Sequence, residues 1–255
     1  MTRIPPALVE CLSTANRILV LSGAGISAES GIPTFRDAMQ GLWSRYRPED
    51  LATPAAFLRQ PELVWQWYQW RRRLVRDAQP NQGHHALAGL QDCLPDLRLV
   101  TQNVDGLHQR AGSKDVVELH GNLFEDRCSN SSCLHAAANA SMESSSPPAC
   151  PKCGALMRPG VVWFGEALPQ AALERAQHAA SHCQLLFSVG TSAVVYPAAD
   201  LAWIGKQAGA TVVEINPEPT PLTAVADFVL PRSGGEILPA LLRALRPDYP
   251  DGAHT

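Results

Sequence analysis

Short runs of apolar residues recur along the chain, and most of them end in a glycine or a polar residue. Continuous apolar runs of this length are typical of strands in a parallel sheet that is covered on both faces. Strands that alternate with helices predict a doubly wound, Rossmann-like α/β fold. We predict strands at 17–22, 97–101, 184–189, 210–215 and 227–230, a shorter strand-like run at 116–117, and helices at 80–93, 170–181, 197–209 and 235–246.

Two segments depart from this alternation. The segment 41–79 is rich in tryptophan and arginine and is predicted to be helical, whereas 121–168 carries four cysteines in a polar, weakly patterned stretch. We interpret both as insertions that build a smaller domain, containing a zinc module, over the cofactor site of one catalytic domain, 1–255. The Rossmann-like core is then formed by approximately 1–40, 80–120 and 169–255.

The composition disfavours several classes of protein. The chain has 255 residues, with 21 Lys and Arg against 24 Asp and Glu, and a net charge of −3. This balance disfavours a nucleic-acid partner bound by bulk electrostatics. No stretch approaches the roughly 18 apolar residues of a membrane span, and the first residues lack the pattern of a secretory signal. We therefore expect a cytoplasmic protein that binds neither membranes nor nucleic acid, and the sequence does not specify its oligomeric state.

Four of the seven cysteines form two closely spaced pairs, Cys128-x4-Cys133 and Cys150-x2-Cys153. Two such pairs separated by a short polar stretch are typical of a structural zinc site with four thiolate ligands and no open coordination position. Two alternatives remain, namely surface cysteines in a disordered loop, or His135 in place of one thiolate. The other cysteines, at 11, 93 and 183, are interpreted as packing residues.

The first predicted strand runs directly into a Gly-x-Gly-x-x-Ala turn made by Gly23, Gly25 and Ala28. Glycines at these positions let the backbone approach a pyrophosphate. The usual fingerprint also has an acidic residue about 20 positions later, at the end of the second strand, which binds the adenosine ribose. Glu49 and Asp50 lie at that distance, but within a proline-rich loop. Ribose recognition is therefore expected elsewhere, and a hydride-transferring dehydrogenase is disfavoured.

Five motifs occur together in the order found in one known family. They are the segments 23–36, 101–108, 118–122 and 162–166 together with the four cysteines. Through them the chain resembles the sirtuins, NAD-dependent protein-lysine deacylases, from about residue 5 to 245. The resemblance implies that NAD is consumed as a co-substrate, that nicotinamide and O-acyl-ADP-ribose are released, and that one Zn²⁺ is structural. The four-residue gap in the first cysteine pair departs from the family, where two residues are more common.

The resemblance also implies which residues form the site. His120 is the expected general base, because an imidazole near its ordinary pKa of about 6.5 accepts a hydroxyl proton at neutral pH. The other seven histidines lack a comparable sequence context. Phe35 and Arg36 are expected beside the nicotinamide ribose, and Asn216 could take the role of the missing acidic residue. The residues implied for NAD are Gly23, Ala24, Gly25, Ser27, Ala28, Thr34, Phe35, Arg36, Gln102, Asn103, Val104, Asp105, Gly190, Thr191, Ser192, Asn216, Pro217, Glu218 and Gly234.

The implied substrate is an acylated lysine in an extended protein or peptide segment. Residues 161–166 are expected to form a strand that pairs with this segment, and 194–196 to pair with it from the other side. Backbone pairing of this kind gives affinity with little sequence preference. The substrate-binding residues expected in the first strand are Val162 and Phe164, which line the tunnel for the lysine stem, and Gly165 and Glu166.

The segment 41–79 also indicates the acyl group. Tyr68 and Arg71 are three residues apart, a spacing that places a phenol and a guanidinium on one helix face, where they could bind a carboxylate. The pair resembles the class III sirtuins, which remove succinyl, malonyl and glutaryl groups. The small Ala52 matches the same class, because it leaves room for a longer acyl chain. The alternative is a Trp-rich core helix with a solvated face at 71–73.

We therefore expect an NAD-dependent protein-lysine deacylase that removes succinyl, malonyl and glutaryl groups, with acetyl as a further substrate. Two alternatives share the scaffold, an enzyme that is mainly a deacetylase and an NAD-dependent mono-ADP-ribosyltransferase. A zinc-ribbon module that binds nucleic acid is disfavoured by the balanced charge. A dehydrogenase is disfavoured by the missing acidic residue.

Overall fold

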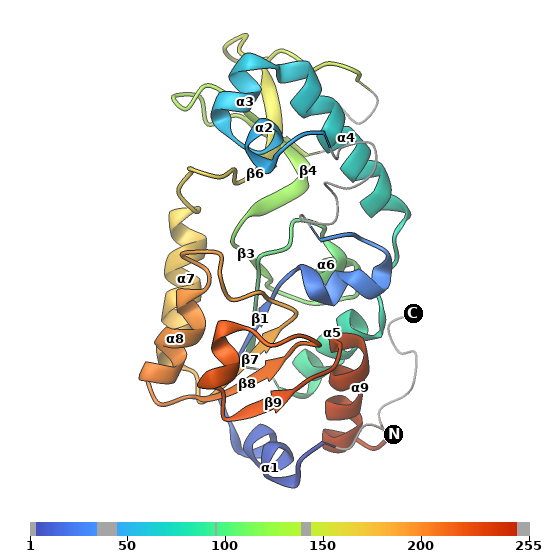
Figure 1. Ribbon diagram of the computed structural model, residues 1–255, viewed down its shortest axis with the longest axis vertical. Helices are drawn as coiled ribbons and strands as arrows, with labels where there is room; N and C mark the ends of the chain where they lie inside the picture. The colour runs from blue at the N-terminus through green and yellow to red at the C-terminus, as the bar shows by residue number, and fades with distance from the viewer. Residues whose placement is uncertain (1–3, 35–44, 95, 139–143, 249–255) are drawn as a thin grey trace.

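A six-stranded sheet forms the centre of the larger part of the molecule (Figure 1). The computed structural model describes residues 4–34, 45–94, 96–138 and 144–248. The strand order is β3-β2-β1-β7-β8-β9, and all neighbouring strands are parallel. This is the order of a doubly wound nucleotide-binding sheet, and it confirms the Rossmann-like prediction. The strands are β1 (Ile18–Ser22), β2 (Leu97–Thr101), β3 (Val117–Glu118), β7 (Leu185–Val189), β8 (Thr211–Ile215) and β9 (Phe228–Leu230).

Helices cover both faces of this sheet. Ile18 and Val20 of β1 belong to one apolar layer, and Leu19 and Leu21 belong to the opposite one. Because both faces are covered, β1 is buried along its whole length, which is why its sequence is a continuous apolar run. The first layer includes α1 (Pro6–Thr14), α5 (Gln82–Cys93) and α9 (Gly234–Leu245). The second layer includes α7 (Gln170–His182) and α8 (Asp200–Gln207). The remaining short elements of this part are η1 (Ala24–Ser30), α6 (Leu107–Arg110) and η4 (Pro221–Ala224).

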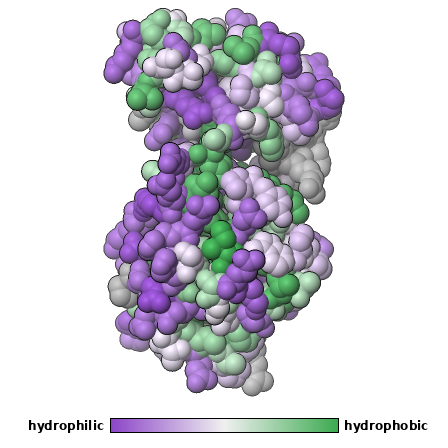
Figure 2. Space-filling view, turned by 90° about the vertical axis from the view of Figure 1, so that its left-hand side faces the viewer, coloured by the Kyte–Doolittle hydropathy of each residue, from purple (hydrophilic) through white to green (hydrophobic). Residues whose placement is uncertain are grey.

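A small unit lies at the upper end of Figure 1, and the surface narrows between it and the large sheet in Figure 2. Three helices and a three-stranded antiparallel sheet of order β5-β4-β6 form this unit and contribute to a third apolar core. Among the described residues, no helix combines the length and apolarity that crossing a membrane requires. The elements of the small unit are α2 (Pro48–Leu51), α3 (Pro54–Arg59), α4 (Pro61–Asp77), β4 (Gly121–Cys128), β5 (Ala136–Ala138) and β6 (Met157–Val161). The exact domain boundaries stay a prediction.

Helix α4 is attached to β4 by a buried ion pair. Arg72 Nη2 lies 2.6 Å from Asp126 Oδ1, and each side chain is 1% exposed. The same guanidinium donates to two backbone carbonyls of β4, at 2.7 and 3.2 Å, which offsets part of the desolvation of its charge. Arg73 is exposed, whereas Arg71 is half-buried. The alternative of a solvated face at 71–73 is therefore wrong, because its central arginine is part of the core.

The loops that follow β1 and β7 approach so closely that glycine is required. A Cβ on Gly25 would lie 2.7 Å from Gly190 Cα, and a Cβ on Gly190 would lie 2.5 Å from Ile26 N. Gly190 also has φ +60°, in the left-handed region. A Cβ cannot lie this close to a non-bonded heavy atom, so any side chain here would push the two loops apart.

We expect Gly190→Ala to lower the free energy of unfolding by about 3 kcal/mol, because left-handed backbone costs an L-residue about 1–2 kcal/mol and the crowded loops must also move. Gly209→Ala is the matched control, because Gly209 has φ +90° with no heavy atom within 4 Å of an added Cβ. Urea unfolding measures both variants. Equal losses would show that crowding does not contribute.

Candidate active site

The two glycine-lined loops meet where the order of the sheet strands reverses, which is the usual ligand position in this fold. Gly23 N donates to Val189 O at 3.0 Å, and Gly25 N donates to Gly190 O at 2.9 Å. The turn predicted after β1 is present and continues as the short 3-10 helix η1. The contact places the start of η1 against the carboxyl end of β7.

Three polar side chains converge beside these loops. Asn103 Nδ2 donates to Ser27 Oγ at 3.1 Å and to Gly23 O at 3.2 Å, and Ser27 Oγ donates to Asp105 Oδ2 at 2.8 Å. All three side chains are buried. Burial raises the pKa of Asp105, although hydrogen bonds from Leu107 N and Ser27 Oγ act in the opposite direction. Residues from η1 and from the loop after β2 therefore form one polar cluster.

His120 lies between β3 and β4, at the edge of this region, and is half-buried. Its Nδ1 is 2.9 Å from Gln102 O. Because a carbonyl oxygen can only accept, the neutral ring carries its hydrogen on Nδ1, which leaves the Nε2 lone pair available. Burial lowers the pKa of His120, opposed by the hydrogen bond to Gln102. The ring is thus held in one orientation and is neutral at pH 7, so its Nε2 can accept a proton.

Two further histidines, which sequence reasoning missed, lie beside this polar cluster. His108 Nε2 is 2.8 Å from Ser22 Oγ, His84 Nε2 is 3.4 Å from Ser27 Oγ, and the ring centroids are 4.9 Å apart. Burial lowers the pKa of His84 to about 2 and that of His108 to about 4. Both rings are therefore neutral at pH 7. The one available signal was that His108 ends the motif 101–108.

Several of the residues expected to bind NAD lie at the carboxyl ends of β7 and β8. Asn216 directly follows β8 and donates from Nδ2 to Thr191 O at 2.9 Å, and Thr191 is buried. Gly234 begins α9, where an added Cβ would lie 3.0 Å from the Val189 side chain. The other expected positions are exposed (Ala24, Ala28, Ser192, Pro217 and Glu218) or half-buried (Thr34, Gln102 and Val104), whereas Phe35 and Arg36 lie outside the described residues.

The strand predicted at 161–166 is wrong beyond Val161. Strand β6 ends there, and 162–166 forms a loop with a turn. The backbone amides of this loop bind within the chain, since the amide at 162 donates to His120 O at 2.8 Å and the amide at 164 donates to Ala52 O at 2.9 Å. Residues 194–196 are likewise a bend rather than a strand.

The side chain of Glu166 holds this loop in place. Its carboxylate lies 2.5 Å from Arg158 Nη1 and 2.8 Å from Arg127 Nη2, and it accepts from Trp163 N at 2.8 Å. Burial raises the pKa of Glu166, but the hydrogen bonds from Arg158 and Trp163 N outweigh it and the pKa is lowered. The Glu166 carboxylate is thus bonded to groups of its own chain, although it was expected to bind the substrate. In contrast, Phe164 is 52% exposed.

Tyr68 and Arg71 lie together on α4. The Arg71 guanidinium carbon is 5.8 Å from the centroid of the Tyr68 ring and 5.1 Å from that of Trp67. Burial raises the pKa of Tyr68, so the phenol keeps its hydrogen at neutral pH. Burial lowers the pKa of Arg71, opposed by Tyr68 and Asp105, and a guanidinium stays charged at neutral pH. Ala52 is 3% exposed and is joined by its carbonyl to the loop 162–166.

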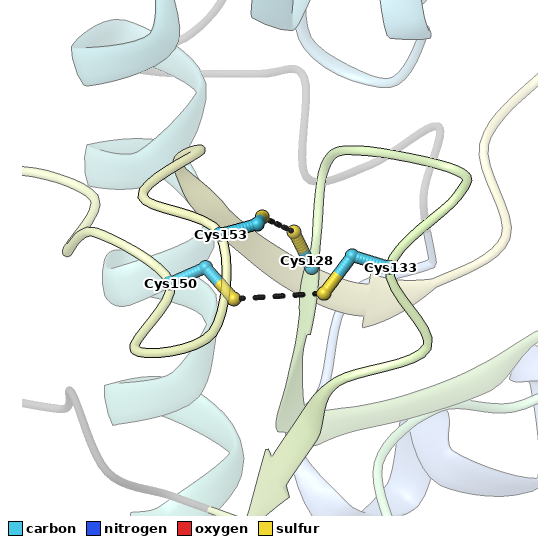
Figure 3. A group of neighbouring side chains, drawn as sticks. All are labelled: Cys128, Cys133, Cys150 and Cys153. Atoms are coloured by element: carbon cyan, nitrogen blue, oxygen red, sulfur yellow. Dashed lines mark hydrogen bonds between the residues drawn. The ribbon is translucent and has the colours of Figure 1, made fainter.

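The four cysteines form a cluster that fits a zinc ion (Figure 3). All four Sγ atoms lie within 4.8 Å of one another, with 3.4 Å between Cys128 and Cys153 and 3.8 Å between Cys133 and Cys150. Tetrahedral Zn–S bonds of about 2.3 Å require sulfur atoms about 3.8 Å apart. Among the described residues, the cluster consists of these thiols without His135. Four sulfur ligands complete the coordination shell, which is typical of a structural site.

Comparison with known sequences identifies close relatives. Residues 23–197 match the Sir2 family. A protein of Pseudomonas aeruginosa named NAD-dependent protein deacylase 1 is 52% identical over 249 residues, covering 94% of this chain and 99% of that protein. A protein of Aquifex aeolicus named NAD-dependent protein deacylase is 51% identical over 237 residues, covering 91% and 96%.

Solved structures share both the large sheet and the small unit. A crystal structure of a Sir2 homolog–NAD complex matches with a TM-score of 0.90 at 47% identity, covering 96% of this chain and 95% of that chain. A structure described as Sir2–p53 peptide–NAD⁺ matches with a TM-score of 0.82 at 33% identity, covering 94% and 98%. The similarity therefore extends over nearly the whole chain.

Mild acid is expected to destabilise the protein through its buried histidines. The folded-state pKa of His108 is lowered from 6.5 to about 4, so the unfolded chain takes up the proton first as the pH falls. The stabilisation is present above pH 6.5 and is lost as the pH approaches 4. We expect His108 alone to account for a fall of about 3 kcal/mol in the free energy of unfolding across this window.

Urea unfolding at several pH values, with matched variants, measures this effect. His108→Gln should reduce the slope between pH 6.5 and 4 by the share of one proton, because this titrating group is removed while His84, whose pKa is lowered to about 2, remains. His178→Gln is the control, because His178 is exposed on α7, and it should keep the wild-type slope. Identical slopes in the two variants would contradict the assignment to the buried ring.

Loss of one thiolate is expected to release the zinc ion and destabilise the small unit. Cys150→Ala should reduce the bound zinc from one ion per chain to less than about 0.2, because three ligands hold zinc far more weakly than four. Its thermal unfolding midpoint should also fall. Cys93→Ala, which changes a cysteine outside the cluster, should keep one zinc ion. Elemental analysis after dialysis measures both, and a full zinc content in Cys150→Ala would argue against the tetrad.

Proposed function

The chain belongs to the Sir2 family, and from this premise we propose that it is an NAD-dependent protein-lysine deacylase that favours acyl groups ending in a carboxylate, such as succinyl, malonyl and glutaryl. Its similarity to named NAD-dependent protein deacylases, over nearly the whole of both chains, supports the reaction. The Tyr68–Arg71 pair on α4 supports the acyl preference. That pair is the observation on which the preference rests.

The close contact of the two loops and the polar cluster beside it fit the pyrophosphate and the nicotinamide riboside of NAD. Gly23, Gly25 and Gly190 let the two loops approach each other closely, at the carboxyl edge of the sheet where a pyrophosphate binds in this fold. Asn103 and Asp105 offer an amide and a carboxylate that suit the carboxamide and ribose hydroxyls of a nicotinamide riboside. NAD supplies a glycosidic bond that breaks with loss of nicotinamide when the amide oxygen of the acyl-lysine attacks. The solved complex of a Sir2 homolog with NAD supports this site.

We assign His120 the role of general base. Its Nε2 lone pair can take the proton of a ribose hydroxyl, which is the step that prepares this hydroxyl to attack the acyl carbon. The Gln102 carbonyl fixes the ring by binding Nδ1 at 2.9 Å. The backbone of His120 also accepts from Val162 N at 2.8 Å. The base is thereby joined to the loop that would contact the substrate.

The acyl-binding pair lies between that loop and the proposed NAD pocket. Tyr68 Oη accepts from Trp163 Nε1 at 2.9 Å, which ties it to the loop. Arg71 and Asp105 each shift the pKa of the other, so the guanidinium lies within electrostatic range of that carboxylate. A carboxylate at the end of an acyl chain could therefore reach the pair while the other end reaches the ribose. An acetyl group has no carboxylate, so it cannot form the charge-assisted fork with the guanidinium.

The peptide is proposed to bind between the loop 162–166 and the bend 194–196. Phe164, Val194 and Tyr196 are 52%, 51% and 64% exposed, which is unusual for such large apolar side chains. An extended peptide would cover these side chains, although the amides at 162 and 164 already bind within the chain. The solved Sir2–p53 peptide–NAD⁺ structure supports a peptide substrate.

We expect Arg71→Met to lower the ratio of desuccinylation to deacetylation by at least about tenfold, because the substitution removes a charge-assisted fork to the acyl carboxylate. Arg73→Met is the matched control, since Arg73 is an exposed residue of the same helix, and it should keep the wild-type ratio. Mass spectrometry of one peptide in succinyl and acetyl forms, with NAD, measures both reactions. A wild-type ratio in Arg71→Met would remove the basis of the acyl preference.

A further inference from the structure

Trp163 is the residue of the loop 162–166 that contacts the acyl-binding pair. Its Nε1 lies 2.9 Å from Tyr68 Oη, and both side chains are 2% exposed. The ring centroids are 6.3 Å apart, with 40° between the planes. The contact joins α4 to a loop 95 residues further along the chain, so it connects the acyl-binding helix directly to the substrate loop.

The chemistry of the two groups sets the direction of this hydrogen bond. An indole N–H can only donate, so the Tyr68 oxygen is the acceptor. A phenol has one hydrogen, which is therefore left for a different partner. Arg71 cannot be that partner, because a guanidinium has donors only. A carboxylate is the kind of group that accepts from Tyr68 and Arg71 together.

The indole is held on several sides. The Arg158 guanidinium carbon lies 3.3 Å from the Trp163 ring centroid, and the Phe57 ring centroid lies 5.4 Å away. The backbone N of Trp163 donates to the Glu166 carboxylate, which is itself paired with Arg158 at 2.5 Å. One ion pair thus restrains both the ring and the backbone of Trp163. The indole N–H consequently has little freedom to turn away from Tyr68.

We propose that Trp163 is a positioning residue for acyl selectivity, which orients the Tyr68 hydroxyl so that its hydrogen points to the terminal carboxylate of the acyl group. The inference rests on the proposed preference for acidic acyl groups. Trp163 acts through Tyr68, so its influence requires the Tyr68 oxygen. The acyl carboxylate carries its charge both before and during the reaction. Loss of the Trp163 hydrogen bond should therefore weaken substrate binding and raise KM more than it lowers kcat.

The test is a double-mutant cycle between Trp163 and Tyr68. Trp163→Phe keeps an aromatic ring and removes the N–H, and Tyr68→Phe removes the hydroxyl that receives it. Both variants, the double variant and the wild type are assayed with NAD and one peptide in succinyl-lysine and acetyl-lysine forms. We expect Trp163→Phe to lower the desuccinylation-to-deacetylation ratio of kcat/KM by about fivefold, mostly through the succinyl KM. In the Tyr68→Phe background we expect less than about a 1.5-fold further change.

Each contrary result has its own meaning. If Trp163→Phe lowers the ratio by the same factor with and without the Tyr68 hydroxyl, the indole acts through packing and the positioning role is overturned. A loss shared equally by both reactions overturns it as well. If Tyr68→Phe itself keeps the wild-type ratio, the acidic-acyl preference and the inference built on it both fail. Should Trp163→Phe unfold, Trp163→benzothienylalanine keeps the shape of the indole without its N–H and repeats the test.

Discussion

The backbone contact between the loops after β1 and β7 is the constraint on which the site depends. Gly25 and Gly190 come together because neither carries a side chain, and an added Cβ on either would lie within 2.7 Å of the other loop. The contact holds η1 in place, so Ser27 of η1 can meet Asn103 and Asp105 from the loop after β2. A site built this way presents backbone and small polar groups at the carboxyl edge of a parallel sheet, where nucleotides bind.

In the small unit, buried ion pairs fix the positions of α4 and of the loop after β6. Arg72 and Asp126 attach α4 to β4, and Arg158 with Glu166 restrains the loop after β6. Desolvated ion pairs contribute little net stability, but they fix geometry, because a shifted partner would leave a buried charge unpaired. The loop and α4 then meet through the bond between an indole and a phenol. We propose that the reaction belongs to the large sheet and the choice of acyl group to the small unit.

The sequence predicted the features that local pattern determines. Strands buried on both faces appear as apolar runs, and the cysteine spacing predicted the cluster because two tight turns suffice to build it. Burial set by distant segments was not predictable, and so the neutral pair of His84 and His108 was missed. The strand expected at 161–166 was wrong because the amides at 162 and 164 bind carbonyls from other parts of the chain. In the sequence, Arg72 could not be distinguished from the exposed Arg73, because only the fold places Asp126 opposite Arg72.

The central claim is that Arg71 and Tyr68 recognise the charge of the acyl group. The most direct test compares kcat/KM of the wild-type enzyme for two peptides, one with succinyl-lysine and one with succinamoyl-lysine. The second acyl group has the same length and nearly the same shape, but a carboxamide replaces the carboxylate. We expect the carboxamide to lower kcat/KM by about tenfold or more, because it cannot form the charge-assisted fork with a guanidinium. Equal kcat/KM for the two peptides would contradict the account.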